Sequence, residues 1–426
     1  MFKGKFNDIV LKDEGFLRGP FGSALKKSLF VPKSVNAYKV YEQSVVLEKN
    51  KNLGEYYISK EYFESKLKNF EVKSGDFLVS CSGVNYGEIY ELEGKIEKGV
   101  INQALLRVRI NEKIVDRNYF LYYFRAYIAK VITGGSGDST IPNFPPMDFV
   151  KNVEVELPDL VVQRKIGRIL KRIDKKYELN NHINNNLEEL MKTIYQRWFI
   201  EFEFPNKEGK PYKSNGGKLV YNDILKKQIP EKWSVKKIGE LTEVITGKED
   251  ANFSTQNGKY KFFTCSNEIL QCDVSAFEGS SILIAGNGDF NVKHYTGRFN
   301  AYQRTYVLIP KDISLYCSMY ISALYKINSF KRGSNGSIVK FITKNDVENI
   351  DVIIPNQKEY LKELNEIIFK IEKNNMENDK LKELKEFILP LLMNSQINVD
   401  DIESWSDKLW FSELVYLMLY NSYTEV

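Results

Sequence analysis

The chain contains the same order of segments twice. Each copy has a loop rich in glycine and serine, a short apolar strand that ends in a proline, a glutamine and then a long helix. The first copy leads to Gln163 and the second to Gln357. The equivalent residues Val150 and Val347 lie about 200 residues apart, which is too far for a solenoid repeat and suits a duplicated domain. The sequence therefore predicts two copies of one module that perform the same task.

The composition allows both modules to fold. Of the 426 residues, 43% are hydrophobic and 27% are charged, which supplies enough apolar material for two cores. The sequence has no uncharged apolar run of about 18 residues, and its first residues lack the apolar stretch of a signal peptide. We therefore predict a cytoplasmic protein with no membrane contact.

Cysteine and histidine usage argues against a metal site. The four cysteines are scattered, none forms a CxxC pair, and the chain has only two histidines. No zinc-binding set can be assembled from this spacing. We expect free thiols and no metal in this chain.

Each module reads as a mixture of helices and short strands. The first module is predicted to contain strands at 77–80, 105–110 and 153–157 and a helix at 119–132. The second is predicted to repeat them with strands at 281–285, 305–309 and 352–354 and a helix at 316–330. The predicted fold class is α+β, with two duplicated mixed α/β domains separated by a long antiparallel helical pair.

Two long helices are the clearest elements. From 163 to 198 and from about 357 to 393, apolar residues recur at steps of three and four. Each helix would span roughly 54 Å, and burying both apolar stripes is simplest if the helices pair antiparallel as a coiled coil. Asparagines interrupt both stripes, at 180–186 and 374–378. A solvated face is the favoured interpretation, and fixing of the helix register is the alternative.

Several segments are similar to the specificity subunits of type I restriction-modification systems. Residues 163–174, 177–188 and 198–199 resemble the central conserved region of that family, and 19–26, 102–106 and 137–144 resemble its target-recognition domains. The resemblance covers residues 1 to about 395. The second module departs from the pattern of the first at Gly336 to Phe341, and the tail from Ile397 onward resembles nothing in the family.

The resemblance implies a DNA-recognition subunit without chemistry of its own. In the family, the two target-recognition domains bind the halves of an asymmetric bipartite site on double-stranded DNA. The helices dock two methyltransferase subunits, which in turn support restriction and translocase subunits. S-adenosylmethionine, ATP and Mg are expected in those partners, and no cofactor in this chain. The implied domains are 1–160 and 203–355 for recognition, 161–202 and 356–396 for the long helices, and 397–426 for a tail that is expected to be helical.

Candidate DNA contacts combine cations with small polar side chains, which suit phosphates and base edges. The net charge of +5 is too mild to decide the matter, so clustering carries the argument. In the first module the candidates are Arg18, Ser23, Lys26, Lys27, Ser82, Asn85, Tyr86, Ser136, Asp138, Ser139 and Thr140. In the second they are Lys248, Asn287, Asn291, Lys293, His294, Arg298, Gln303, Arg304, Arg332, Ser334, Asn335, Ser337 and Lys340. Each residue alone is more often a surface or capping residue, and for His294 a DNA-facing or surface position is favoured over a general base.

Two other classes of function remain open. Asp76, Glu93 and Lys95 have the type and order of a metal-dependent nuclease core, and the long helices alone would suit a protein-binding scaffold. Phe144-Pro145-Pro146-Met147 is similar to the signature of adenine methyltransferases, but phenylalanine cannot accept the hydrogen bond that the first position must accept from the target amine. The glycines from Gly134 to Gly137 follow a helix rather than a strand and read as a loop.

Overall fold

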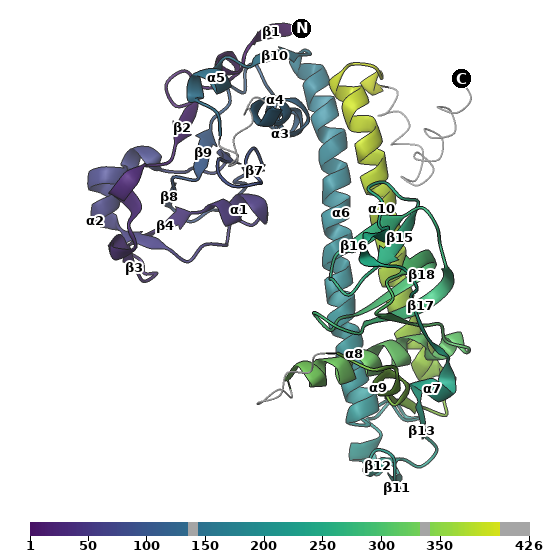
Figure 1. Cartoon of the computed structure of the whole chain (residues 1–426). Coiled ribbons are helices and arrows are strands. Elements are labelled where there is room, and N and C mark those ends of the chain that lie inside the picture. Colours follow the sequence, from purple (N-terminus) through teal and green to yellow (C-terminus); the bar gives the residue numbers. More distant parts are fainter. Residues whose placement is uncertain (135–143, 333–340, 401–426) are drawn as a thin grey trace, which may run out of the picture. The chain divides into compact units, whose positions relative to one another are not determined.

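The computed structural model describes residues 1–134, 144–332 and 341–400, without the side chains of 331 and 332. The described chain divides into two compact units, residues 1–177 with 379 onward and residues 178–378. Figure 1 shows both, with the long helices α6 and α10 in teal and yellow. Each unit therefore contains one mixed α/β domain, half of α6 and half of α10. The domain boundaries drawn from the sequence remain a prediction.

The first unit contains two four-stranded sheets, and an aromatic helix packs on the first of them. The first sheet has the order β2-β9-β6-β7 and consists of antiparallel pairs, and the second has the order β3-β5-β4-β8. The first comprises β2 (Phe16–Arg18), β6 (Phe77–Ser80), β7 (Ile89–Glu91) and β9 (Leu105–Val108). The second comprises β3 (Phe30–Val31), β4 (Ala37–Tyr41), β5 (Tyr57–Ser59) and β8 (Gly99–Ile101). The short helices are α1 (Gln43–Leu47), α2 (Lys60–Tyr62) and α5 (Met147–Lys151).

The aromatic helix covers the first sheet. It consists of α3 (Arg117–Tyr123), a π-helical turn (Phe124–Ile128) and α4 (Ala129–Gly134). It begins at Asp116, whose carboxylate accepts the Tyr119 amide at 3.1 Å and so caps the helix. Phe120 and Phe124 are fully buried, and the Phe120 ring meets Phe77 of β6 edge-on at 4.9 Å. This burial holds the helix on the sheet.

The second unit repeats this plan with one larger sheet. Its six strands follow the order β14-β19-β17-β18-β15-β16. They are β14 (Val244–Thr246), β15 (Tyr260–Phe263), β16 (Ile269–Cys272), β17 (Phe277–Ala285), β18 (Val292–Ala301) and β19 (Thr305–Leu308). In the first domain, β7 belongs to one sheet and β8 to the other. In the second domain the single strand β18 pairs with both β17 and β15, and so it joins the equivalent strands into one sheet. The helices are α7 (Ile238–Leu241), α8 (Tyr316–Arg332) and α9 (Lys344–Glu348), and β11 (Leu219–Asn222) forms a hairpin with β12 (Lys227–Pro230).

The duplication is visible in how each domain closes before its long helix. In the first domain β1 (Phe2–Lys5) pairs antiparallel with β10 (Glu154–Leu157), and β10 leads into α6 (Leu160–Tyr195). In the second, β13 (Ser234–Lys237) pairs antiparallel with β20 (Asp351–Ile354), and β20 leads into α10 (Lys358–Met393). The predicted strands and helices are thus confirmed, and so is the predicted fold class.

The two long helices pack together, antiparallel. In the first unit Ile166, Ile169, Leu170 and Ile173 of α6 share a buried cluster with Leu381, Leu384, Ile388 and Leu392 of α10. In the second unit Met191 and Tyr195 of α6 share a cluster with Leu361, Leu364 and Ile368 of α10. Early residues of α6 therefore meet late residues of α10, and late residues meet early ones. Among the described helices, none combines the length and the apolar character needed to cross a membrane.

Buried asparagines pair across the helices and correct the favoured interpretation of a solvated face. Asn180 donates to Asn378 at 3.0 Å, and Asn374 donates to Asn184 at 2.7 Å. All four side chains belong to buried residues, whereas His182, Asn185 and Asn186 are exposed as expected. A shift of register would leave buried amides without partners, so these pairs specify the alignment of α6 with α10.

Candidate nucleic-acid interface

In the first domain, three loops converge at one end of the central strands. Residues 19–22 follow β2, residues 81–85 follow β6, and residues 102–104 precede β9. The Gly19 amide donates to the Leu105 carbonyl at 2.9 Å, and the Cys81 amide donates to the Ala104 carbonyl at 2.8 Å. A Cβ on Gly19 would lie 1.8 Å from the Asn102 carbonyl oxygen, so only glycine allows this approach. We call these segments the three-loop face of the first domain.

The second domain builds the same face from equivalent loops. Residues 247–250 follow β14, residues 286–289 follow β17, and residues 302–304 join β18 to β19. The Gly247 amide donates to the Thr305 carbonyl at 3.0 Å, and the Gly286 amide donates to the Arg304 carbonyl at 2.8 Å. A Cβ on Gly247 would lie 2.1 Å from a carbonyl oxygen of Ala301. These two hydrogen bonds match those of the first domain, with Arg304 and Thr305 in the places of Ala104 and Leu105. Gln303, the residue before them, is therefore equivalent to Gln103.

Several predicted contacts lie exposed on or beside these faces. In the first domain Ser23, Lys26, Lys27 and Asn85 are exposed, and Arg18 is half-buried with its guanidinium over the rings of Phe21 and Phe144. In the second domain Lys248, Gln303 and Arg304 are exposed and Asn287 is half-buried. Arg298 is exposed on β18 with its guanidinium over the Tyr260 ring. Ser82 is half-buried and donates to Gln43.

Four candidates make contacts inside their own unit. Tyr86 is buried and its hydroxyl donates to the Thr133 carbonyl at 2.9 Å. Lys293 donates to the carbonyls of Thr264 and Ser266 and to the side chain of Asn291, and burial lowers its pKa. Asn291 in turn donates to the Cys265 carbonyl at 2.8 Å. These three residues shape loops instead of presenting free polar groups.

His294 is the fourth, and its predicted surface position is wrong. Only 7% of its side chain is exposed, and its Nδ1 lies 2.9 Å from an Oε1 of Glu372 on α10. Its ring meets Tyr320 of α8 edge-on. The reason is that β18 presents His294 toward the long helix and not toward solvent.

The remaining candidates cannot be placed. Ser136, Asp138, Ser139, Thr140, Ser334, Asn335, Ser337 and Lys340 lie outside the described residues, and so does the side chain of Arg332. Their described neighbours do reach the three-loop faces. The Phe144 ring lies 5.2 Å from the Arg18 guanidinium, and the Ile342 amide donates to the Gly286 carbonyl at 2.7 Å.

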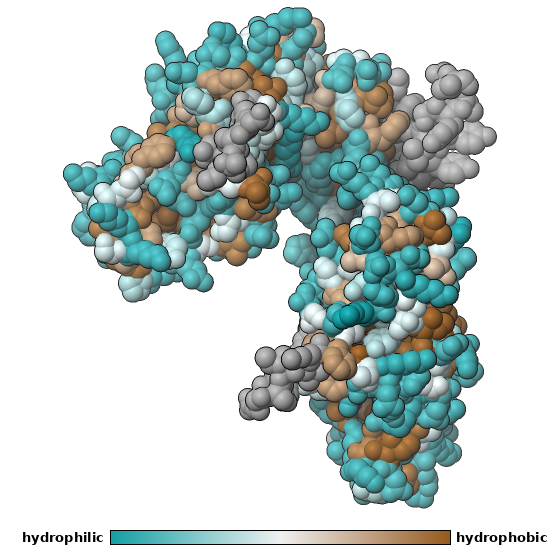
Figure 2. All heavy atoms as spheres, in the orientation of Figure 1, coloured by the Kyte–Doolittle hydropathy of each residue, from teal (hydrophilic) through white to brown (hydrophobic). Residues whose placement is uncertain are grey.

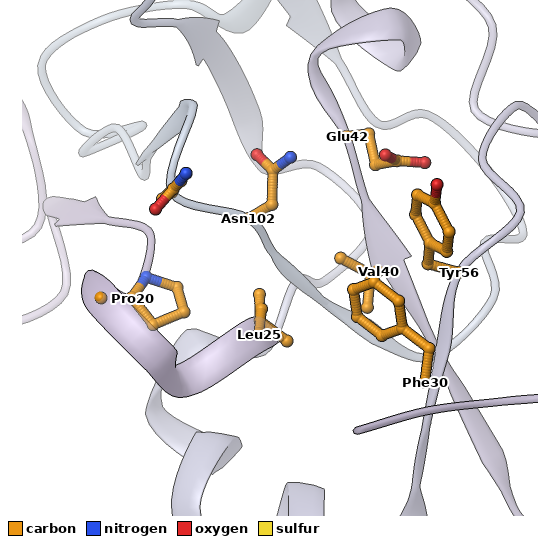
Figure 3. Close-up of a pocket in the computed structure, with 9 residues that line it drawn as sticks. Pro20, Leu25, Phe30, Val40, Glu42, Tyr56 and Asn102 are labelled. Atoms are coloured by element: carbon orange, nitrogen blue, oxygen red, sulfur yellow. The ribbon is translucent and has the colours of Figure 1, made fainter. Parts of the chain in front are cut away.

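A small cavity opens beside the three-loop face of the first domain. Its volume is about 150 Å³, and Pro20, Gly22, Asn102 and Gln103 of the face contribute to its lining. Figure 3 shows the rings of Phe30 and Tyr56 on one side and the side chains of Glu42 and Asn102 at the rim. Burial raises the pKa of the Glu42 carboxyl. The cavity thus combines flat apolar walls with hydrogen-bonding groups.

The sequence of the whole chain decides the family. The family described as "Type I restriction modification DNA specificity domain" matches residues 21–189 and 230–386. The chain belongs to this family. It is a type I restriction-modification specificity subunit, which is a non-catalytic component. Membership of this family implies that the chain takes part in DNA target recognition within the complex.

Known members of the family resemble the chain to different extents. The EcoDI specificity subunit of Escherichia coli is 34% identical over 177 residues, which are 40% of this chain and 40% of that protein. The MjaIX specificity subunit of Methanocaldococcus jannaschii is 24% identical over 71% of this chain and 73% of that protein. A crystal structure of the S subunit of a type I system from M. genitalium shares the fold with a TM-score of 0.56, at 15% identity over 92% of this chain and 95% of that chain.

Membership of the specificity family removes the nuclease alternative, and the geometry agrees. The Asp76 carboxylate binds the Arg109 guanidinium at 2.7 and 3.0 Å, and the Glu93 carboxylate pairs with Lys171 of α6. No cluster of metal-binding side chains occurs in the described ranges. Asp76 and Glu93 therefore act as structural ion pairs in this specificity subunit.

Sequence reasoning missed Gln103, Asn102 and Glu42 as site residues. Asn102 and Gln103 belong to a segment that resembles the family, but the equivalent turn in the second domain shares only the glutamine: Asn102-Gln103-Ala104-Leu105 stands against Tyr302-Gln303-Arg304-Thr305. Gln103 and Gln303 are separated by almost the same number of residues as Val150 and Val347, so an alignment of the two copies with a short gap would have revealed the shared glutamine. Glu42 carries no such signal, because it reaches the cavity only through the folding of β4.

Proposed function

We propose that this specificity subunit reads an asymmetric bipartite site on double-stranded DNA, one half-site with each domain. The observation that carries the proposal is the matching pair of three-loop faces, which share a backbone frame but carry different side chains. Exposed cations beside each face suit phosphates, and the glutamine of each face suits base edges. Because the side chains differ, the two half-sites should differ in sequence.

The proposal includes the partners that the family implies. Two methyltransferase subunits would dock on α6 and α10 and methylate adenine with S-adenosylmethionine. Restriction and translocase subunits that use ATP and Mg would join through the same complex, in the cytoplasm. This chain would select the DNA site, and its partner subunits would carry out the reactions.

Reconstitution with a methyltransferase partner tests the proposal. The full chain is expressed with the methyltransferase subunit encoded beside it, in a host that lacks other adenine methylation, and methylated positions are mapped across the genome. We expect one motif made of two short half-sites of different sequence around an unread spacer. The proposal would be wrong if the methylated positions shared no bipartite motif, or if methylation persisted when this chain was omitted.

The two equivalent glutamines allow a paired test of the faces. We expect Gln103→Ala to weaken discrimination at one half-site and Gln303→Ala to weaken it at the other. Loss of a two-point hydrogen bond to a base costs about 1–3 kcal/mol, which mapping of methylated sites detects as new bases tolerated at one position. Gln228→Ala, on the exposed surface of strand β12, is the matched control and should change neither half-site. If both face variants relax the same half-site, the assignment of one face to each half-site is wrong.

A further inference from the structure

Two carboxylates occupy equivalent positions on the long helices. Asp174 of α6 and Glu372 of α10 each accept a hydrogen bond from a tyrosine on the helix that covers the sheet of the adjoining domain. The Tyr122 hydroxyl donates to Asp174 at 2.7 Å, and the Tyr316 hydroxyl donates to Glu372 at 2.6 Å. Each carboxylate also follows a fully buried isoleucine of its helix, Ile173 or Ile371. We call Asp174 and Glu372 the carboxylate anchors.

The second anchor obtains its remaining partners from its own recognition domain. Glu372 is buried, and it contacts His294 Nδ1 at 2.9 Å and the Thr296 hydroxyl at 2.5 Å, both on β18. Burial acts to raise the pKa of the Glu372 carboxyl, but the contacts with His294, Thr296 and Tyr316 outweigh it and hold that pKa below its usual value. The anchor thus joins β18, α8 and α10 at one point.

The first anchor obtains its remaining partner from the opposite long helix. Lys385 of α10 donates to Asp174 at 2.5 Å, and its ammonium lies 5.0 Å from the centre of the Tyr122 ring. Because Asp174 is equivalent to Glu372, the same separation along the chain makes Leu187 of α6 the equivalent of Lys385. Leucine carries no charge, so among the described residues of α6 this position gives the second anchor no basic partner.

We infer that Asp174 and Glu372 are positioning residues that orient the recognition domains for reading DNA, and that the two attachments differ. The second domain itself supplies the partners of its anchor, because His294 and Thr296 both contact Glu372. The attachment of the first domain depends on Lys385 and therefore on correct pairing of the helices. The expected effect on DNA reading rests on the proposed function. The attachment of each domain to its helix does not depend on that function.

The physical reason for an effect on reading is geometric. A hydrogen bond to a base edge tolerates only a few tenths of an ångström, since its donor and acceptor must lie about 3 Å apart. A domain that rocks on its helix can meet its half-site at more than one distance from the other half-site. Loosening an anchor should therefore broaden the range of spacers accepted, while each half-site keeps its sequence.

Isosteric variants separate positioning from folding. Glu372→Gln and Thr296→Val keep the volume of the side chain but weaken the second anchor, and Lys385→Met keeps the stem of the lysine but removes the partner of the first. Lys373→Gln changes an exposed neighbour on α10 and is the control. Two quantities are measured on the full chain: amide hydrogen exchange in α3 and α8, and the spacers found among methylated sites after reconstitution.

We expect exchange in α8 to become about tenfold faster in Glu372→Gln and Thr296→Val, as loss of one charge-assisted hydrogen bond permits. Exchange in α3 should become faster only in Lys385→Met. Methylation at spacers one base pair longer or shorter should rise in all three variants and not in Lys373→Gln. Unchanged exchange in α8 and α3 would overturn the inference. If the wild-type complex shows no bipartite motif, the proposed function fails, and the exchange experiment still decides whether the anchors hold the domains.

Discussion

Duplicating one heptad in each long helix should lengthen the unread spacer by about three base pairs and leave both half-sites unchanged. Seven helical residues add about 10 Å, which corresponds to about three base pairs at 3.4 Å each. A heptad also returns the chain to nearly the same face of the helix, with a drift of about 20°. Methylation of sites with the original spacer should fall to background, because the two domains can no longer reach both half-sites together.

The asparagine pairs decide which residues to insert. A second copy of residues 177–183 is placed after Lys176, and a second copy of residues 377–383 after Met376. Because Asn180 pairs with Asn378 and Asn184 with Asn374, the inserted asparagines then face Asn378 and Asn180, and no buried amide loses its partner. The duplicated segments also repeat the native spacing of apolar residues.

Mapping of methylated sites measures the outcome. Inserting the heptad in α6 alone is the control, since it offsets the asparagines and should reduce the yield of folded protein instead of changing the spacer. An altered half-site combined with the original spacer would contradict the idea that the helices set the distance between the domains.

Removing Asp76 should destabilise the first domain by about 3–5 kcal/mol, because it leaves buried arginine charge without its partner. The side chains of Asp76 and Arg109 are only 4% and 10% exposed. Arg107 is buried beside them and donates to the Glu71 carbonyl at 2.5 Å, and Glu14 pairs with Arg109 from the surface. Glu14 alone is too exposed to replace the lost carboxylate.

Hydrogen exchange in β6 and β9 measures this effect in Asp76→Ala. Tryptophan fluorescence is less suitable, since residues 1–197 contain no tryptophan. Asp13→Ala, at an exposed position, is the control and should change little. Arg109→Met should destabilise the domain by a similar amount, because it leaves the buried Asp76 carboxylate with only its bond from the Lys73 amide at 2.8 Å. Native exchange rates in Asp76→Ala would show that this ion pair does not support the fold.

Local patterns were enough to predict most elements. Strand β6 begins at Phe77 and ends at Ser80 as predicted, and both long helices begin and end within a few residues of their predicted bounds. Strand β6 is a continuous apolar run and the long helices have a helical apolar pattern, and both signals depend on neighbours in the sequence. The family also followed from short segments such as 163–174, because they lie within a single helix.

The candidate site was predicted less completely. Of the candidate DNA contacts, Lys26, Lys248 and Arg304 lie exposed on or beside the two faces. Tyr86, Lys293 and His294 are instead engaged in contacts inside the protein. The sequence around His294 does not indicate that its partner is Glu372, which lies 78 residues away. Burial of a polar side chain depends on such distant partners, so a single sequence gives no local sign of it.

The sequence by itself determined the duplication, the two long helices, the mixed α/β class and the family, because each depends on order and periodicity along the chain. Only the tertiary structure decided that buried asparagines pair across the helices, that Gln103 and Gln303 hold equivalent places, and that His294 contacts Glu372 instead of lying exposed. The physical reason is that hydrogen-bond partners and burial are set by contacts between distant segments. A polar residue on a strand or helix looks the same in sequence whether it faces water or a buried partner.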